Sequence, residues 1–140
     1  MSTPAAYLLD TNVVSETRKK KADAGVMAFL RGIDSSSLYL SVLTIGELRK
    51  GVAAKKPQDP IAAKSLAAWV EGLEAGFADR ILEIDLPVAR LWGEWSGDRP
   101  RAVIDTLLAA TASVHGLTLV TRNTQHVLDL TVKTLNPWSG

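Results

Sequence analysis

Short apolar runs alternate with longer amphipathic segments along almost the whole chain. The runs that we expect to form strands are residues 6–9, 37–43, 80–85, 117–121 and 131–135. Helical spacing of apolar side chains predicts helices over residues 13–33, 44–54, 61–77, 87–96 and 102–116. Apolar strands separated by helices are typical of a parallel sheet that helices cover on both faces. The sequence therefore predicts an α/β fold.

Size and composition narrow the class of protein further. A chain of 140 residues with 46% hydrophobic side chains favours one domain, residues 1–140. The absence of cysteine excludes disulfides and thiolate metal sites, and it suits a cytoplasmic location. No apolar stretch approaches the roughly 20 residues of a membrane span, and no basic segment followed by an apolar one predicts a signal peptide. We expect a cytoplasmic protein without a membrane partner.

Three acidic residues stand out because of their surroundings. Asp10 ends the first apolar run, Glu47 lies in "SVLTIGELRKG", and Asp105 emerges from a largely apolar segment. Ligands of parallel α/β sheets bind at the carboxyl ends of strands, which is where Asp10 is predicted to lie. With no cysteine, and with no zinc-ligand spacing between the two histidines, the natural partner of such acids is Mg²⁺ or Mn²⁺. Spacing leaves open whether Glu47 and Asp105 join Asp10.

Each acid also has a purely structural interpretation. Asp10 could cap the helix that follows it. Glu47 comes three residues after Thr44, which is the spacing of a capping box. Asp105 lies in the first turn of its predicted helix, where a carboxylate favours the helix dipole. These interpretations and a shared cation site are compatible with one another.

Four stretches in order along the chain resemble the PIN-domain family, and most of all the VapC and FitB-like toxins of bacterial toxin–antitoxin pairs. They are "YLLDTNVVSE", "LYLSVLTIGELRKG", "RAVIDTLLAATASVHGLTLVTRN" and "LNPW". The resemblance implies a three-layer α/β/α sandwich with a central parallel sheet of strand order 3-2-1-4-5. It also implies a cognate antitoxin as protein partner and a homodimer.

The same resemblance implies a metal-dependent endoribonuclease that uses Mg²⁺ or Mn²⁺ to cut RNA. Asp10, Glu47 and Asp105 match the first three family acids. Hydrolysis by an activated water would leave a 5′-phosphate and a 3′-hydroxyl. The residues expected to support the acids or to contact substrate are Thr11, Asn12, Ser41, Thr44, Thr121, Arg122 and Asn123. Helix capping is an equally good interpretation of Ser41 and Thr44.

The chain departs from the family pattern after the fourth expected strand. Family members commonly place a fourth acid there, but this sequence reads "TRNTQHV" over residues 121–127. Asn123 and His126 take the usual acid positions. His126 could act near the cleft, but we expect it to be a surface residue of a helix. An alternative hypothesis is therefore a catalytically weakened PIN-like module that binds RNA or a partner.

Other features leave further alternatives open. A strand-end Asp followed by Thr also occurs in enzymes that form an aspartyl-phosphate, although those of the haloacid-dehalogenase kind usually carry a second Asp where this chain has Asn12. The run from Arg18 to Lys21 could contact the RNA backbone or simply be solvated.

Overall fold

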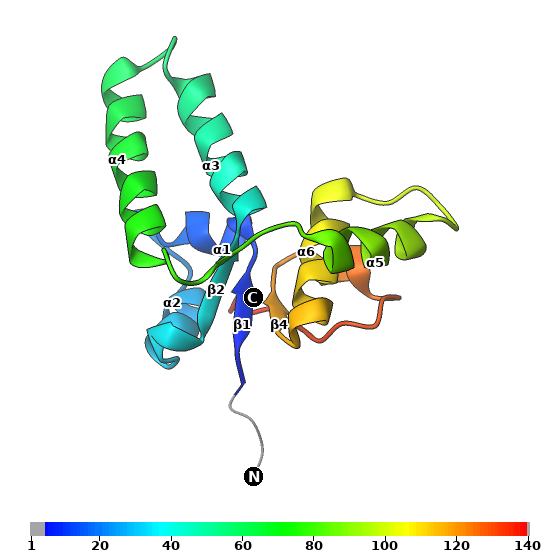
Figure 1. Ribbon diagram of the computed structural model, residues 1–140. Coiled ribbons are helices and arrows are strands. Elements are labelled where there is room, and N and C mark those ends of the chain that lie inside the picture. The colour runs from blue at the N-terminus through cyan, green and yellow to red at the C-terminus, as the bar shows by residue number, and fades with distance from the viewer. Residues whose placement is uncertain (1–4, 140) are drawn as a thin grey trace.

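The computed structural model describes residues 5–139, and a sheet of five parallel strands runs through its centre (Figure 1). The strands are β1 (Tyr7–Leu9), β2 (Leu38–Ser41), β3 (Ile81–Leu82), β4 (Thr118–Val120) and β5 (Thr134–Leu135). Their order across the sheet is β3-β2-β1-β4-β5, and every neighbouring pair is parallel. The predicted strand order 3-2-1-4-5 is confirmed.

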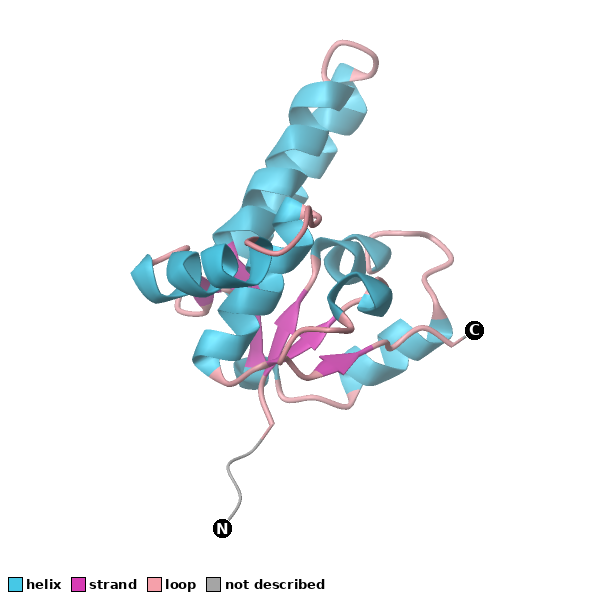
Figure 2. Ribbon diagram, turned by 90° about the vertical axis from the view of Figure 1, so that its right-hand side faces the viewer, coloured by secondary structure: helices cyan, strands magenta, loops and turns pink. Residues whose placement is uncertain are grey.

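Helices cover both faces of this sheet, which confirms the three-layer sandwich (Figures 1 and 2). They are α1 (Thr11–Glu16), α2 (Ala24–Arg31), α3 (Val42–Lys55), α4 (Pro60–Gly76), α5 (Leu86–Ser96) and α6 (Val103–His115), with short 3₁₀ turns at Ser35–Ser37 and Thr124–Val127. The α3–α4 pair projects beyond the sheet as an arm (Figure 2). Over residues 5–139, no helix has the length and apolarity that crossing a bilayer requires.

The alternation of side chains along β1 divides the core into two parts. Leu9 packs with the buried residues of α1, α2, α3 and α4, whereas its neighbour Leu8 packs with Leu108 and Leu119 on the α6 side. Successive side chains of a strand point to opposite faces, so a strand buried on both faces must be apolar throughout. This is why β1 reads as an unbroken apolar run until Asp10.

Residues 13–33 form two helices with a break between them, where the helical spacing predicts one continuous segment. Helix α1 ends at Glu16, whose buried carboxylate accepts a hydrogen bond from the Asp23 backbone N–H at 2.9 Å and pairs with Lys19. The Asp23 side chain then caps α2 by accepting from Val26 N. The chain turns between these two acids, and the basic run from Arg18 to Lys21 lies in that turn.

Strand β2 is shorter than predicted because Ser41 ends it and begins a helix. The Ser41 hydroxyl accepts a hydrogen bond from Leu43 N at 3.0 Å, so Val42 and Leu43 belong to α3. Strand β3 is likewise shorter than predicted, and Asp85 caps α5 through Val88 N. Gly116 ends α6 in the left-handed conformation, with φ of 66°, which glycine adopts without strain.

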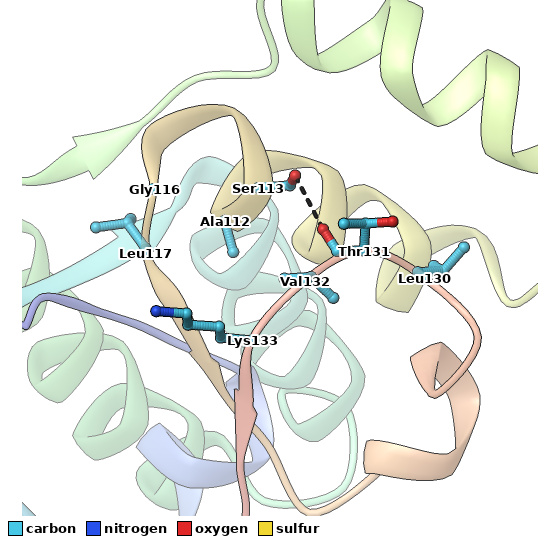
Figure 3. A pocket seen from close by; sticks show the side chains of 8 residues that line it. All are labelled: Ala112, Ser113, Gly116, Leu117, Leu130, Thr131, Val132 and Lys133. Carbon is cyan, nitrogen blue, oxygen red and sulfur yellow. Dashed lines mark hydrogen bonds between the residues drawn. The ribbon is translucent and has the colours of Figure 1, made fainter.

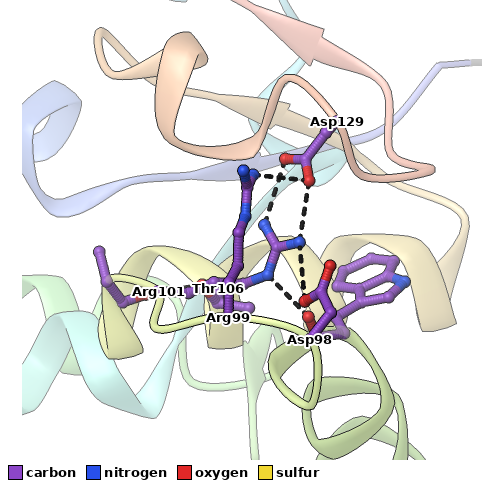
Figure 4. Close-up of polar contacts among 7 residues, drawn as sticks. Asp98, Arg99, Arg101, Thr106 and Asp129 are labelled. Atoms are coloured by element: carbon purple, nitrogen blue, oxygen red, sulfur yellow. Dashed lines mark hydrogen bonds and ion pairs between the residues drawn. The ribbon is translucent and has the colours of Figure 1, made fainter.

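An ion-pair cluster anchors the loop that leads into α6 (Figure 4). Arg101 binds both oxygens of Asp129, at 3.1 and 2.8 Å, and also donates to the Trp95 carbonyl at 2.7 Å. Arg99 binds Asp129 at 2.7 Å. The hydrogen bonds from Arg101 are the main cause that lowers the pKa of Asp129 to about 2. The cluster thus ties the segment just before α6, the helix that carries Asp105 in its first turn, to Asp129.

Replacing Asp129 with asparagine is expected to destabilise the protein at neutral pH and to have progressively less effect in acid. The pKa of Asp129 is lower in the folded chain than its ordinary value of 3.8. Its stabilising contribution is therefore present above pH 3.8 and is lost as the pH falls toward about 2. Urea unfolding of both proteins between pH 7 and pH 3 measures this. A constant difference in the free energy of unfolding would contradict it.

Candidate active site

Asp10 lies at the carboxyl end of the central strand β1, which has β2 and β4 as its neighbours in the sheet. Its backbone N–H extends the sheet by donating to Val120 O at 2.9 Å. One carboxylate oxygen accepts from Thr11 N at 2.6 Å, and the other accepts from the Thr121 hydroxyl at 2.7 Å. Asp10 therefore caps α1 and, through Thr121, contacts the end of β4 as well. The capping interpretation is confirmed, and it coexists with a place at the sheet edge.

Thr11 connects the end of β1 to helix α3. Its hydroxyl donates to Glu47 Oε1 at 2.5 Å and lies 3.1 Å from the Thr44 hydroxyl. The N-cap of α3 is Ser41, and Thr44 is buried within the first turns of the helix. The capping-box interpretation of Thr44 and Glu47 is therefore wrong, because the helix begins three residues earlier than that motif requires. Glu47 is free to face Thr11.

Asp105 lies in the first turn of α6, as predicted, and it contacts a histidine. Asp105 Oδ2 lies 2.5 Å from His126 Nδ1, which comes from the 3₁₀ turn Thr124–Val127. The His126 side chain is 43% exposed and that of Asp105 is 21% exposed. The prediction of a surface histidine is confirmed by this exposure, but it did not include the contact with Asp105. The only sequence signal for it was that His126 stands where an acid is usual.

The charges of Asp105 and Glu47 act on the carboxyl group of Asp10. The pKa of Asp10 is raised, first by burial of its carboxyl group and then by the negative charges of Asp105 and Glu47, against the lowering effect of the Thr121 and Thr11 hydrogen bonds. Only 5% of Asp10 is exposed. A carboxylate in such a site is stabilised when a cation joins it. Glu47 and Asp105, which are far from Asp10 in the chain, thus both raise the pKa of the Asp10 carboxyl group.

The remaining predicted residues occupy different places around Asp10. Ser41 serves as the cap of α3, and Asn123 donates its backbone N–H to the Thr121 hydroxyl at 3.0 Å. Arg122 is exposed and stacks on Trp138, with 5.1 Å between its guanidinium carbon and the ring centre. In the described residues, Asn12 Oδ1 is a buried oxygen without a hydrogen-bond partner. The carbonyl oxygen of the Asn12 side chain, one of the predicted supporting residues, can therefore still accept a hydrogen bond.

The residues present fit a hard divalent cation in donor chemistry. Side-chain oxygens of Asp10, Glu47 and Asp105 are the type of ligand that Mg²⁺ and Mn²⁺ prefer. No three acidic or histidine side chains within residues 5–139 are gathered tightly enough to form a metal cluster by themselves. The pKa of Asp10 is raised by burial first and by the charges of Asp105 and Glu47 second, and a cation beside this carboxylate would oppose both effects.

A cleft of about 540 Å³ lies away from these acids, between the C-terminal end of α6 and residues 130–133 (Figure 3). Lys133 is its one charged lining residue, and Ser113 within it donates to the Thr131 carbonyl at 3.2 Å. None of the three acids lines this cleft. The lining of this cleft contains no Asp, Glu, His or Cys side chain. It therefore lacks the groups that a hydrolytic site needs, although it is large.

The sequence profile of the PIN domain matches residues 7–128, a range that includes Asp10, Glu47 and Asp105. The chain belongs to the PIN-domain family. Toxin FitB of Neisseria gonorrhoeae is 36% identical to this PIN domain, over 94% of this chain and 97% of FitB. VapC ribonuclease Y4jK of Sinorhizobium fredii is 34% identical, over 94% of this chain and 96% of that protein. Both relatives are matched over almost their whole length.

Solved structures share this PIN fold. The crystal structure of FitAcB from Neisseria gonorrhoeae contains a chain with a TM-score of 0.86 and 34% identity, covering 96% of this chain and 99% of that one. VapBC-1 from nontypeable Haemophilus influenzae has a TM-score of 0.75 at 19% identity, which shows the fold alone. The predicted resemblance to VapC and FitB-like PIN domains is confirmed.

Proposed function

We propose that this PIN domain is a metal-dependent endoribonuclease that hydrolyses RNA phosphodiester bonds as the toxin of a toxin–antitoxin pair. The observation that carries the proposal is the buried carboxyl group of Asp10, whose pKa is raised first by burial and then by the charges of Asp105 and Glu47. The relatives named as toxin and as ribonuclease support the substrate class. The chain would act as a single PIN-like domain.

Asp10, Asp105 and Glu47 would hold Mg²⁺ or Mn²⁺. Such an ion supplies Lewis acidity toward a phosphoryl oxygen and lowers the pKa of a bound water. Thr11 and Thr121 would orient Glu47 and Asp10, because their hydroxyls donate to these carboxylates. With Oε1 occupied by Thr11, Glu47 would have Oε2 left either for the ion or to accept a proton from the attacking water.

An aspartyl-phosphate mechanism is less well supported by the same contacts. Both oxygens of Asp10 accept hydrogen bonds, one from Thr11 N and one from the Thr121 hydroxyl. A carboxylate that attacks phosphorus needs a free, exposed oxygen, and Asp10 is buried. The two hydrogen bonds to Asp10 suit a carboxylate that is held in place as a metal ligand better than one that acts as a nucleophile.

RNA cleavage with and without divalent ions tests the proposal. We expect cleavage of single-stranded RNA in Mn²⁺ or Mg²⁺, none in EDTA, and products with a 5′-phosphate and a 3′-hydroxyl. A 2′,3′-cyclic phosphate would mean that the RNA 2′-hydroxyl is the nucleophile, contrary to the proposal. The same ions are expected to raise the melting temperature, because only the folded chain brings the acids together.

A second candidate is a binding module with little turnover. The contact between His126 and Asp105 favours it, because it occupies one oxygen of Asp105 at the place where the family usually supplies another acid. Such a module would bind RNA without cutting it in either metal. The cleavage assay therefore separates the two candidates.

We also propose a cognate antitoxin, a homodimer and a cytoplasmic setting. The name of FitB as a toxin supports an antitoxin partner. Exposed apolar side chains at the starts of two helices, Val42 of α3 and Val103 of α6, support a contact between two copies. A cleft lined by Leu43 and Ile104, and also by the charged residues Glu47 and Lys50, lies in the same region.

A further inference from the structure

A small cleft bordered by Glu47, one of the three candidate acids, lies between helices α1, α3 and α4. Its volume is about 220 Å³, and Thr11 and Glu47 belong to its lining. The same lining includes Arg18, just beyond α1, and Trp69 of α4. We call it the Arg18 cleft. It therefore holds a carboxylate of the candidate site and a guanidinium group within one concave surface.

The guanidinium group of Arg18 is held in place by two contacts. Its central carbon lies 5.4 Å from the centre of the Trp69 ring, and one of its N–H groups donates to the Ser65 hydroxyl at 3.0 Å. The residue is otherwise exposed, so its other donors face solvent. A cation held in this way loses little conformational entropy when an anion binds. Arg18 is therefore prepared to bind an anion beside the acidic site.

Charge and shape indicate which anion suits the Arg18 cleft. A cation at the acidic end, near Glu47, would draw in the phosphate to be cut, and Arg18 at the other end can bind the next phosphate of the same strand. Arginine donors match phosphate geometry, and bases of single-stranded RNA stack on tryptophan and guanidinium planes. A cleft of about 220 Å³ is too small for a duplex, so its occupant would be part of a single strand.

We propose that the Arg18 cleft is the subsite for the nucleotide adjacent to the scissile phosphate in single-stranded RNA. Arg18 binds the phosphate of that nucleotide, and Trp69 holds the guanidinium plane against which the base stacks. Ser65 orients Arg18. This inference rests on the proposed ribonuclease function and adds the way in which the strand is held.

RNA binding by variants made in the Asp105→Asn background tests the subsite without cleavage. Fluorescence anisotropy with a labelled single-stranded RNA of mixed sequence, in Mg²⁺ and over a series of KCl concentrations, gives the affinity and its salt dependence. Arg18→Ala is expected to weaken binding about tenfold and to reduce the slope of log K against log salt by about 0.7, the loss of one phosphate contact. Ser65→Ala is expected to weaken binding less and to leave the slope unchanged, because the charge remains.

Arg90→Ala is the matched control, since Arg90 is an exposed arginine on α5 and does not line the cleft. Melting temperatures verify that each variant is folded. Equal affinity and salt slope for Arg18→Ala and Arg90→Ala would overturn the subsite and leave the cleft to a protein partner. Failure of the Asp105→Asn parent to bind RNA would also overturn the subsite, because the Arg18 contact does not depend on the ion. Absence of RNA cleavage by the unsubstituted protein would instead overturn the proposed function.

Discussion

Replacing Asp105 with asparagine is expected to slow RNA cleavage by at least about 1,000-fold, which corresponds to about 4 kcal/mol of transition-state stabilisation. The carboxylate is a proposed ligand of the divalent ion, and its charge already acts on Asp10. An amide keeps the shape and the ability to contact His126 but removes the charge. Initial rates in Mn²⁺ and Mg²⁺ measure the effect.

A second measurement on this variant distinguishes loss of the site from loss of the fold. Without metal, Asp105→Asn is expected to melt at the same temperature or higher, because the repulsion on Asp10 is relieved. The rise in melting temperature that Mn²⁺ produces in the parent should disappear. Asp98→Asn is the matched control, since Asp98 is 68% exposed and lies shortly before α6. Unchanged metal-dependent cleavage by Asp105→Asn would refute the role assigned to Asp105.

Replacing Gly25 with alanine is expected to destabilise the chain by about 1–3 kcal/mol, as overpacking does. A β-carbon there would overlap the Pro137 carbonyl oxygen and would lie only 2.8 Å from Ser139 N. Both are backbone atoms of the C-terminal segment, which Asp23 holds through two hydrogen bonds from Ser139. The segment would have to move away from α2. Denaturant unfolding at neutral pH measures the loss.

Gly72→Ala provides the control for Gly25→Ala. Gly72 lies inside α4, and a β-carbon there would meet no atom within 4 Å. Alanine is the better helix former, so this change is expected to stabilise the chain by about 0.5–1 kcal/mol. The two substitutions should therefore have opposite signs although both lie in helices. Stabilisation by Gly25→Ala would mean that the C-terminal segment does not pack on α2 as described.

The position of Asp10 could be predicted from the sequence because it depends on local pattern. An apolar run that is buried on both faces has to end where the chain leaves the sheet, and a charged residue marks that end. The closing Gly116 and the first-turn position of Asp105 were predicted from local pattern as well. The resemblance supplied the strand order, which no local pattern specifies.

Other features depend on contacts between distant segments and could not be predicted from the sequence. The break between α1 and α2 follows from Glu16 binding the Asp23 backbone, a contact across the turn that helical spacing cannot reveal. The partner of Glu47 is Thr11, 36 residues away, and not Thr44 of a capping box. His126 meets Asp105 because a 3₁₀ turn lies beside the start of α6.

By itself, the sequence determined the strand and helix types, the cap at Asp10 and the chemical identity of the acids, since each follows from neighbouring residues and their periodicity. Only the tertiary structure decided that the charges of Glu47 and Asp105 reach Asp10, that Thr121 holds this carboxylate, and that Arg18 shares a cleft with Glu47. The physical reason is that burial and Coulomb interaction depend on distance in space. Separation along the chain leaves that distance undetermined until the sheet and its helices have packed.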